Sequence, residues 1–482
     1  MTEPMIIQGG MGVAVSNWRL ARAVSRTGQL GVVSGTALEN VLARRLQLGD
    51  KDGSVRLALD YFPNPSIARK ILERFFISGG KAQGVPFKNP PMFSLDPPRE
   101  LVELTVAANF VEVFLAKEGH PGLVGINYLE KIQLPTLPSL YGALLAGVDY
   151  VLMGAGIPRS IPALLDQLAL HQKVSLKVHV QGAAPEDDYQ VSFDPKDILD
   201  FPGPPLKRPK FIAIVSSEVL AITLAKKSTG KVDGFVIEDP TAGGHNAPPR
   251  GPLHLNDKGE PLYGPKDHVD LGAFRKLGLP FWLAGSCADP KKLKEAISHG
   301  ATGIQAGTVF AYCEESGLMD WIKKKVFAKA LRGQEEVFTD PIASPTGFPF
   351  KIVRLEGTLS EAEEYKARPR CCDLGYLRTV FKRKDGTVGY RCPGEPREVY
   401  LQKEGKEEDM AGRKCICNGL MTGIGLGQEH KNGYQEKPLV TSGDDLARIV
   451  SLLKGEHLSY SASDVIHYLL SAFSGGLGPV TA

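Results

Sequence analysis

Short apolar runs that end at glycine, serine or asparagine recur along the first two thirds of the chain. Eight of them are rich in Val and Ile, and segments with the hydrophobic spacing of helices separate them. They cover residues 5–10, 30–35, 123–128, 150–156, 211–217, 233–238, 281–286 and 303–308. Strands that are apolar along their whole length are typical of a parallel sheet buried on both faces. The pattern predicts an α/β fold, a (β/α)8 TIM barrel. A doubly wound open sheet is the alternative, because alternation alone does not show whether a sheet closes.

Two segments interrupt this rhythm, and a third replaces it. Residues 36–122 indicate a helical insertion, and residues 174–210 indicate a hairpin followed by a proline-rich linker. The alternation of strands and helices ends near residue 335. We therefore expect a barrel over residues 1–335 and a C-terminal α-rich domain or lid over residues 336–482. This second part contains five of the seven cysteines and ends in two amphipathic helices.

Composition narrows the class of protein. The 57 basic and 54 acidic side chains give a net charge of +3, which is no basis for a surface that binds nucleic acid. No run approaches the ~18 apolar residues that a membrane span needs. The first strand begins almost at the initiator methionine, which leaves no room for a signal peptide. We expect a soluble cytoplasmic protein with reduced thiols that acts on a small molecule. The oligomeric state is left open.

The turns after the last two predicted strands are candidate phosphate sites. They read AGSCADP and AGTVFAYC, and each precedes a helix. Gly285 and Gly307 let the backbone approach an anion closely, and the hydroxyls of Ser286 and Thr308 add donors. Barrels of this kind often hold a phosphate at this place. The alternative is that these residues are ordinary tight turns.

The first and third strands end in residues that suit a flat ligand. The first ends in QGGMG, so that Gly10 and Met11 offer backbone with few side chains in the way. The third ends at Asn127, whose amide can both donate to and accept from the edge of a heteroaromatic ring. A turn-capping asparagine is an equally good interpretation of that residue.

The loop after the sixth strand contains the most reactive candidate. It reads EDPTAGGHNAPPRG, in which His245 follows two glycines and precedes two prolines. The pattern predicts a stiff, water-accessible loop at the catalytic face. Histidine exchanges its proton near neutral pH, so His245 is a natural base for removing a proton from carbon. The alternative is a surface histidine bonded to backbone. Glu238 and Asp239 either orient His245 or cap a helix.

Five cysteines cluster in the C-terminal part: Cys371, Cys372, Cys392, Cys415 and Cys417. Thiolates in pairs can bind zinc or an iron–sulfur cluster, although CC and CxC are not the usual spacing. Buried structural thiols are the alternative, and a disulfide is not expected in a reducing compartment. These residues are candidate metal ligands without an assigned metal.

Several of these segments together resemble one family. MIIQGGMG, the VGIN strand end, TAGGHN and the AGSCADPKKLKEAISHGATGIQAGTVF run followed by EESG are similar to the nitronate monooxygenases, formerly called 2-nitropropane dioxygenases. These are FMN-dependent TIM barrels related to the flavin enoyl-acyl-carrier-protein reductases. The resemblance covers most of residues 4–320 apart from the insertions. After His245 the chain departs from the usual Arg-Gly, because Asn246, Ala247 and two prolines follow.

The resemblance implies FMN as the cofactor and assigns residues to it. The residues expected to bind FMN are Gly10, Met11, Asn127, Ala242, Gly243, Gly244, Gly285, Ser286, Gly307 and Thr308. The last four would hold the phosphate, in agreement with the interpretation of those turns. His245 would be the catalytic base.

Three functions follow from these expectations. The first is oxidation of a small alkyl nitronate with O2, as in the family. The second is NAD(P)H-dependent reduction of an enoyl thioester or a quinone, because of the relationship to enoyl reductases. The third is a non-enzymatic role in which the cysteine-bearing part binds a metal or a partner protein. Fold analogy alone does not choose between them.

Overall fold

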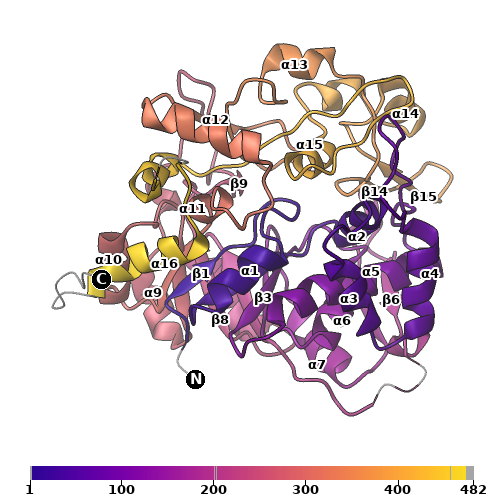
Figure 1. Ribbon diagram of the computed structural model, residues 1–482, viewed down its shortest axis with the longest axis horizontal. Helices are drawn as coiled ribbons and strands as arrows, with labels where there is room; N and C mark the ends of the chain where they lie inside the picture. Colours follow the sequence, from indigo (N-terminus) through magenta and orange to yellow (C-terminus); the bar gives the residue numbers. More distant parts are fainter. Residues whose placement is uncertain (1–2, 200, 202, 456–457, 474–482) are drawn as a thin grey trace.

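Eight parallel strands close into a barrel, as the computed structural model of residues 3–199, 201, 203–455 and 458–473 shows (Figure 1). The strands are β1 (Ile6–Gln8), β2 (Leu30–Ser34), β3 (Val124–Leu129), β4 (Tyr150–Gly154), β7 (Lys210–Val215), β8 (Gly234–Glu238), β10 (Phe281–Ala284) and β11 (Gly303–Ala306). Their order around the barrel is β1-β11-β10-β8-β7-β4-β3-β2, and β1 closes it by pairing with both β2 and β11. All eight predicted strands are present. The predicted TIM barrel is confirmed, and the open-sheet alternative is wrong.

Burial on both faces explains why the strands read as continuous apolar runs. One set of side chains, including Ile7, Leu152 and Trp282, forms a separate cluster inside the barrel. Alternate residues such as Ile6 and Val151 pack outward against the helices. A parallel sheet with two buried faces has no solvated side on which polar residues can alternate.

Helices surround the barrel. They are α1 (Trp18–Ser25), α6 (Thr136–Leu145), α7 (Ile161–Ala169), α8 (Glu218–Lys227), α9 (Leu271–Leu277), α10 (Pro290–Ser298), α11 (Thr308–Ala311) and α12 (Asp320–Leu331). Helices α1, α8, α9 and α10 each begin at a capping side chain. The Ser217 hydroxyl accepts the Leu220 N–H at the start of α8. The Asp289 carboxylate accepts the Lys291 N–H at the start of α10, where Pro290 is the first helical residue. None of the helices within the described ranges is long and apolar enough to cross a membrane.

Both predicted insertions are present beside the barrel. The first contains α2 (Leu38–Gln47), α3 (Ser54–Asp60), α4 (Pro65–Phe75) and α5 (Arg99–Lys117), which lie together at one side of the molecule (Figure 1). The second contains an antiparallel hairpin of β5 (Val174–Lys177) and β6 (Gln190–Phe193), followed by a short 3₁₀ turn, η1 (Pro195–Asp197). The predicted linker follows, and residues 200 and 202 lie outside the described part.

The C-terminal part combines short helices with small sheets. Its elements are β12 (Val337–Asp340), β13 (Phe350–Val353), α13 (Ala362–Ala367), β14 (Thr379–Lys382), β15 (Val388–Arg391), α14 (Arg397–Gln402), η3 (Glu407–Met410), α15 (Ile416–Gly423), η4 (Leu446–Leu452), α16 (Ala462–Leu470) and η5 (Ser471–Phe473). The first of the two predicted amphipathic helices is a 3₁₀ helix, η4. The residues just before it are held by barrel loops: the Gly443 N–H donates to the Thr308 hydroxyl, and the Asp444 N–H donates to the Thr241 carbonyl oxygen.

This part is joined to the barrel in two ways. Strand β13 pairs with β12 on one side and with β9 (Gly244–His245), which comes from the loop after β8, on the other. Helix α16 returns to pack against α1 and α10 (Figure 1). One apolar cluster contains barrel residues and residues of α16 together. The domain boundary at residue 336 stays a prediction, and residues 474–482 of that segment lie outside the described part.

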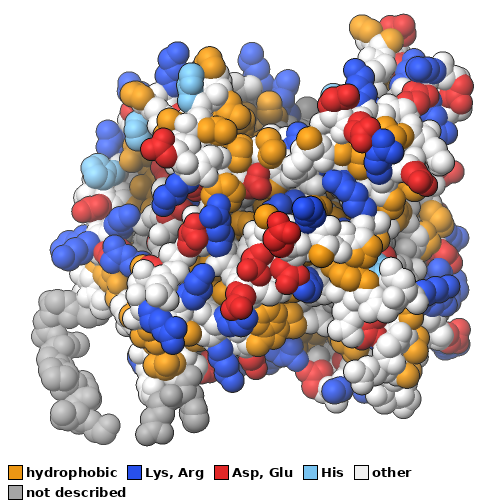
Figure 2. Space-filling view, turned by 90° about the horizontal axis from the view of Figure 1, so that it is seen from above, with side chains coloured by type: hydrophobic (Ala, Val, Ile, Leu, Met, Phe, Trp, Pro, Cys, Tyr) orange, Lys and Arg blue, Asp and Glu red, His pale blue; other side chains and the backbone are white. Residues whose placement is uncertain are grey.

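Charges of both signs are interspersed on the face seen from above (Figure 2). This agrees with the small net charge of the sequence.

Candidate active site

A cavity of about 420 Å³ lies at the carboxyl ends of the barrel strands. Residues at or just after all eight strands line it, as expected for the functional face of such a barrel. All eleven predicted site residues are among them: Gly10, Met11, Asn127, Ala242, Gly243, Gly244, His245, Gly285, Ser286, Gly307 and Thr308. The structure thus brings together every residue that was singled out at this face, and the role of each stays a prediction.

The end of strand β1 lies in close contact with the end of strand β3. A Cβ at Gly10 would collide with the Cβ of Asn127, so only glycine lets the end of β1 lie against the end of β3. The Asn127 Nδ2 donates to the Tyr128 carbonyl oxygen at 3.1 Å, which leaves its Oδ1 for a ligand.

Two polar side chains at the cavity have an unpaired buried oxygen. The Gln305 Oε1 and the Asn246 Oδ1 are buried and have no hydrogen-bond partner among the described residues. An unpaired buried acceptor costs roughly 1–3 kcal/mol, so a ligand with N–H or O–H donors would be stabilised here. Sequence analysis did not single out either residue as a ligand. The signal for Gln305 was present, since it is a polar residue near the end of an otherwise apolar strand.

His245 is held by the C-terminal part rather than exposed in a free loop. It is half-buried, pairs with Phe350 in the β9–β13 ladder, and its ring centroid is 4.8 Å from that of Phe350. Its Nε2 is 2.7 Å from the Ser344 Oγ, and Ser344 in turn contacts the Thr346 hydroxyl at 2.7 Å. The predicted water-accessible loop is therefore wrong, because strand pairing with β13 and the Phe350 ring exclude water from one side.

Burial and a nearby lysine keep His245 uncharged. Burial, together with the nearby Lys131 ammonium, lowers the pKa of His245 to about 3. Burial also lowers the pKa of Lys131 to about 7, although Glu130 opposes this shift. The Lys131 Nζ lies 3.0 Å from the centroid of the Phe348 ring and has no hydrogen-bond partner among the described residues. His245 is therefore neutral at physiological pH, and Lys131 is a titratable cation that sequence analysis missed.

Neither acidic residue after β8 orients His245. The Asp239 Oδ1 accepts the Thr241 N–H at 2.9 Å and the Thr241 hydroxyl at 2.7 Å, and so closes a local turn. Glu238 lines the cavity, and burial, reinforced by Asp239, raises its pKa to about 7. The residue that positions His245 is Ser344, which no sequence pattern connects to residue 245.

The predicted phosphate end carries charges of both signs. Gly285 and Ser286 both have positive φ, 101° and 46°, and the Lys292 Nζ donates to the Ser286 carbonyl oxygen at 2.7 Å. The Thr308 Oγ1 already accepts the Gly443 N–H at 3.0 Å. Burial raises the pKa of the Asp445 carboxyl. The contacts of this carboxyl with Thr308 and with the Ala288 N–H lower its pKa, but burial has the larger effect.

The remaining wall of the cavity comes from the C-terminal part and is mainly apolar. Its residues include Phe348, Phe350, Leu374, Tyr376, Leu377, Ile416, Cys417 and Leu420. The Tyr376 hydroxyl donates to the Glu39 Oε2 at 2.8 Å, which fixes this wall to helix α2. Sequence analysis did not predict this wall, since nothing in the pattern of these residues relates them to the strand ends.

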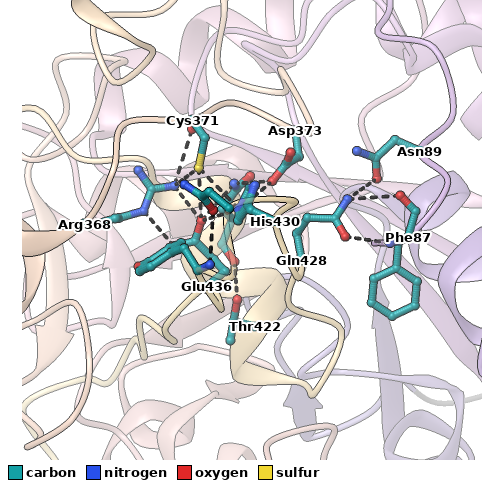
Figure 3. Close-up of polar contacts among 12 residues, drawn as sticks. Phe87, Asn89, Arg368, Cys371, Asp373, Thr422, Gln428, His430 and Glu436 are labelled. Atoms are coloured by element: carbon teal, nitrogen blue, oxygen red, sulfur yellow. Dashed lines mark hydrogen bonds and ion pairs between the residues drawn. The ribbon is translucent and has the colours of Figure 1, made fainter. Parts of the chain in front are cut away.

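The five C-terminal cysteines divide into two sets. All seven cysteines of the chain are free thiols. Cys371 belongs to a group with Asp373, His430 and Glu436, whose ligand atoms lie within 4.8 Å of one another (Figure 3). The other four are Cys372, Cys392, Cys415 and Cys417, and Cys417 also lines the cavity.

Comparison with known proteins gives similar structures but no family match. No family model and no curated protein matches the sequence. FabK from Thermotoga maritima is 16% identical, with a TM-score of 0.48 over 98% of this chain and 93% of that chain. Nitroalkane oxidase from Streptomyces ansochromogenes is 12% identical, with a TM-score of 0.46 over 98% and 96% of the two chains.

A third similar structure is the enoyl reductase domain of MlnA from the macrolactin biosynthesis cluster of Bacillus amyloliquefaciens. It is 10% identical, with a TM-score of 0.45 over 98% of this chain and 95% of that domain. The barrel assignment itself rests on the strand pairing of this chain.

Proposed function

We propose that the cavity binds a flavin and that the protein is a flavin-dependent oxidoreductase. The observation that carries this proposal is the convergence on one cavity of all eleven residues that the sequence resemblance implied. These residues come from loops that are far apart in the sequence. The cavity has a volume of about 420 Å³, which is within the usual range for cofactor sites.

The ring end of the cavity suits an isoalloxazine. Glycines at the end of β1 and in the β8 loop present flat backbone to a planar ring. The unpaired oxygens of Gln305 and Asn246 would accept hydrogen bonds from the N–H groups of the ring or from its ribityl hydroxyls. The residues present therefore fit a flavin ring.

The residues at the other end of the cavity determine whether it can bind FMN or only an unphosphorylated flavin. Gly285, Ser286 and Lys292 offer open backbone and a positive charge for a phosphate. Asp445 opposes this when it is ionised, because like charges repel in a partly buried site. We propose FMN, with Gly285, Ser286 and Gly307 as the main phosphate contacts.

A bound flavin would supply the exchange of electrons with the substrate, and the chain's own residues would do the rest. If the His245 Nε2–H donates to Ser344, the Nδ1 lone pair is available to take the α-proton from a neutral nitroalkane, which gives the nitronate that is then oxidised. The apolar C-terminal wall would keep water away from the reacting atoms. The Lys131 ammonium beside His245 would attract a small anion such as an alkyl nitronate. We therefore propose oxidation of an alkyl nitronate with O2 as the reaction.

One observation favours a second candidate. A pKa of about 3 makes His245 a weak base, whereas a general base is most effective with a pKa near the working pH. Reduction of an enoyl thioester or quinone with NAD(P)H takes its hydride from the nucleotide and does not need a strong base at this position.

An anaerobic titration of the purified protein distinguishes these candidates. We expect a yellow protein whose flavin absorbance is bleached by an alkyl nitronate but not by NADH or NADPH. Bleaching by NADH or NADPH instead would establish the reductase candidate. A protein that neither contains flavin nor binds added FMN or riboflavin would overturn the proposal as a whole.

A further inference from the structure

Three chain segments bring four thiols together beside the cavity. The segments carry Cys372, Cys392, and the pair Cys415 and Cys417. The Arg370 Nη1 donates to the Pro393 carbonyl oxygen at 2.8 Å, which joins the first segment to the second. The second segment lies close against the third at Gly394, where a Cβ would be only 3.1 Å from the Lys414 carbonyl oxygen and 3.4 Å from the Cys415 nitrogen.

The first and third segments are joined as well. The Asn418 Nδ2 donates to the Asp373 Oδ2 at 2.7 Å, one residue beyond the cysteine on each side. The four thiols are near enough to affect one another electrostatically: Cys415, Cys392 and Cys372 each act on Cys417. Cys372 and Cys415 also act on Cys392.

We propose that Cys372, Cys392, Cys415 and Cys417 are the ligands of an iron–sulfur cluster that lies beside the cavity. Four cysteine thiolates are the usual ligand set of such clusters. This site is independent of the flavin proposal, since it uses residues of the C-terminal part and a different chemistry.

A backbone N–H group near each of the four sulfurs lowers the pKa of that thiol. The donors are Gly375 for Cys372, Gly394 for Cys392, Asn418 for Cys415 and Leu377 for Cys417. A neutral thiol is a weak acceptor, so four such contacts do little for a set of buried thiols. Hydrogen bonds to ligand sulfurs are, in contrast, a common feature of iron–sulfur sites, where they stabilise the negative charge.

Positive charge is available on two sides of this set. Arg378 acts on Cys372, and Arg368 acts on Cys415, and both lower the pKa of the thiol concerned. Burial nevertheless dominates and raises the pKa of Cys415 to about 12. Without a metal the four groups are therefore neutral thiols, and binding a cluster would release their protons.

The spacing of the sulfurs excludes a single zinc ion in the arrangement seen. Four sulfurs at the Zn–S distance of about 2.3 Å are roughly 3.8 Å apart in a tetrahedron. Over the described residues, the Cys371 group is the one set of three or more Cys, His, Asp or Glu with ligand atoms within 4.8 Å, and these four thiols are not part of it. No three of the four sulfurs therefore lie within 4.8 Å of one another, so the arrangement seen does not match a mononuclear zinc site.

The Cys371 group is a competing metal site, and its own arginine already satisfies it (Figure 3). Arg368 donates through Nε and Nη2 to the two oxygens of Glu436, both at 2.6 Å, and Nη2 is 3.3 Å from the Cys371 Sγ. The side chains of Arg368 and Glu436 are fully buried. This ion pair fixes a cation where a metal would otherwise compensate the carboxylates. Cys371 is therefore the matched control for its neighbour Cys372.

The test is anaerobic reconstitution of the full chain with ferrous iron and sulfide, followed by desalting. We expect about four iron and four acid-labile sulfide per chain, and an electron paramagnetic resonance signal after reduction with dithionite. Cys372→Ser, Cys392→Ser, Cys415→Ser and Cys417→Ser should each lose most of the bound iron and the wild-type signal. Cys371→Ser should retain both.

Three outcomes would overturn the proposal. The wild-type chain could bind no stoichiometric iron and sulfide, a result that needs no variant and is unaffected by misfolding. Iron could be lost equally from Cys371→Ser. Alternatively, the chain could contain one zinc that is lost from Cys371→Ser and His430→Ala, which would place the metal at the Cys371 group. None of these results depends on whether flavin binds.

Discussion

The two walls of the cavity consist of different types of residue. The barrel wall consists of glycines and small or polar residues at strand ends, such as Gly10, Asn127 and Gly285, and it offers mostly backbone. The C-terminal wall consists of aromatic and aliphatic side chains, such as Phe350 and Leu377, and it offers a dry surface. The barrel wall is therefore suited to holding a planar cofactor, and the C-terminal wall to shielding what lies on it.

His245 lies where the two walls meet, and this position explains its properties. It comes from a barrel loop but pairs with β13 of the C-terminal part. Its hydrogen-bond partner Ser344 belongs to the C-terminal part as well. A residue of the first wall thus acquires its orientation from the second.

The largest effect is expected from His245→Ala, which removes the residue that connects the walls. Turnover of a neutral nitroalkane should fall by ~10²–10⁴-fold if His245 is the base, because its α-carbon must first lose a proton, while flavin content stays unchanged. Stopped-flow measurement of flavin reduction checks this. His254→Ala, at an exposed histidine of the following loop, is the control. Unchanged reduction in His245→Ala would remove the residue from the mechanism and leave only its place in the wall.

Gly243→Ala should separate the walls without changing any functional group. Its Cβ would be 2.6 Å from the Ser442 carbonyl carbon and 2.8 Å from the Gly443 nitrogen, both of them backbone atoms that cannot move aside easily. Overpacking of this kind costs roughly 1–3 kcal/mol, so we expect a lower free energy of unfolding and weaker flavin binding. Urea unfolding and flavin titration measure the two. Gly264→Ala, where a Cβ would meet no atom within 4 Å, should behave like the wild type.

Asp445→Asn should change the binding of the flavin phosphate at one end of the cavity and leave the binding of the flavin ring at the other end unchanged. Removing a negative charge beside Thr308 should strengthen binding of FMN roughly threefold to tenfold, and should leave riboflavin binding unchanged. Fluorescence titration with both flavins checks this. Asp444→Asn, which breaks a 2.7 Å ion pair with Lys351 at the neighbouring position, is the control. An equal change for both flavins would mean that the phosphate does not lie at this end.

The pH dependence of stability tests the buried carboxyl at the end of β8. The pKa of Glu238 rises from 4.5 to about 7 on folding, because burial penalises the carboxylate. Between these values the folded protein keeps a proton that the unfolded chain has lost, so stability decreases as pH rises through this range. Glu238→Gln should reduce that decrease by roughly 1–3 kcal/mol. Urea unfolding at pH 5 and pH 8 tests it, and equal pH dependence in both proteins would contradict the assignment.

The sequence was sufficient to predict the barrel wall, because each of its residues follows an apolar run directly. Eight runs gave eight strands, and the carboxyl ends of parallel strands meet at one face, so residues as distant as Gly10 and Thr308 could be placed together. Closure of the sheet was predicted from the number of strands and not from any local pattern, since it depends on the pairing of β1 with β11.

The C-terminal wall could not be predicted, for a related reason. Ser344 contacts His245 only because β13 adds to a two-residue strand in the β8 loop, and such a short pairing has no sequence signature. Lys131 is similar, because its lowered pKa results from burial by segments that follow far along the chain. Gln305 could have been found, as a polar residue in an apolar strand.

The pairing of β9 with β13 also affects the order in which the barrel and the cavity are completed during synthesis. All eight barrel strands are present once residue 306 has left the ribosome, but the lining of the cavity extends to Asp445. Until residue 350 has emerged as well, His245 lacks its hydrogen-bond partner Ser344, its aromatic neighbour Phe350, or both. A nascent chain could therefore have a complete barrel for more than a hundred residues of further elongation before it has a complete pocket.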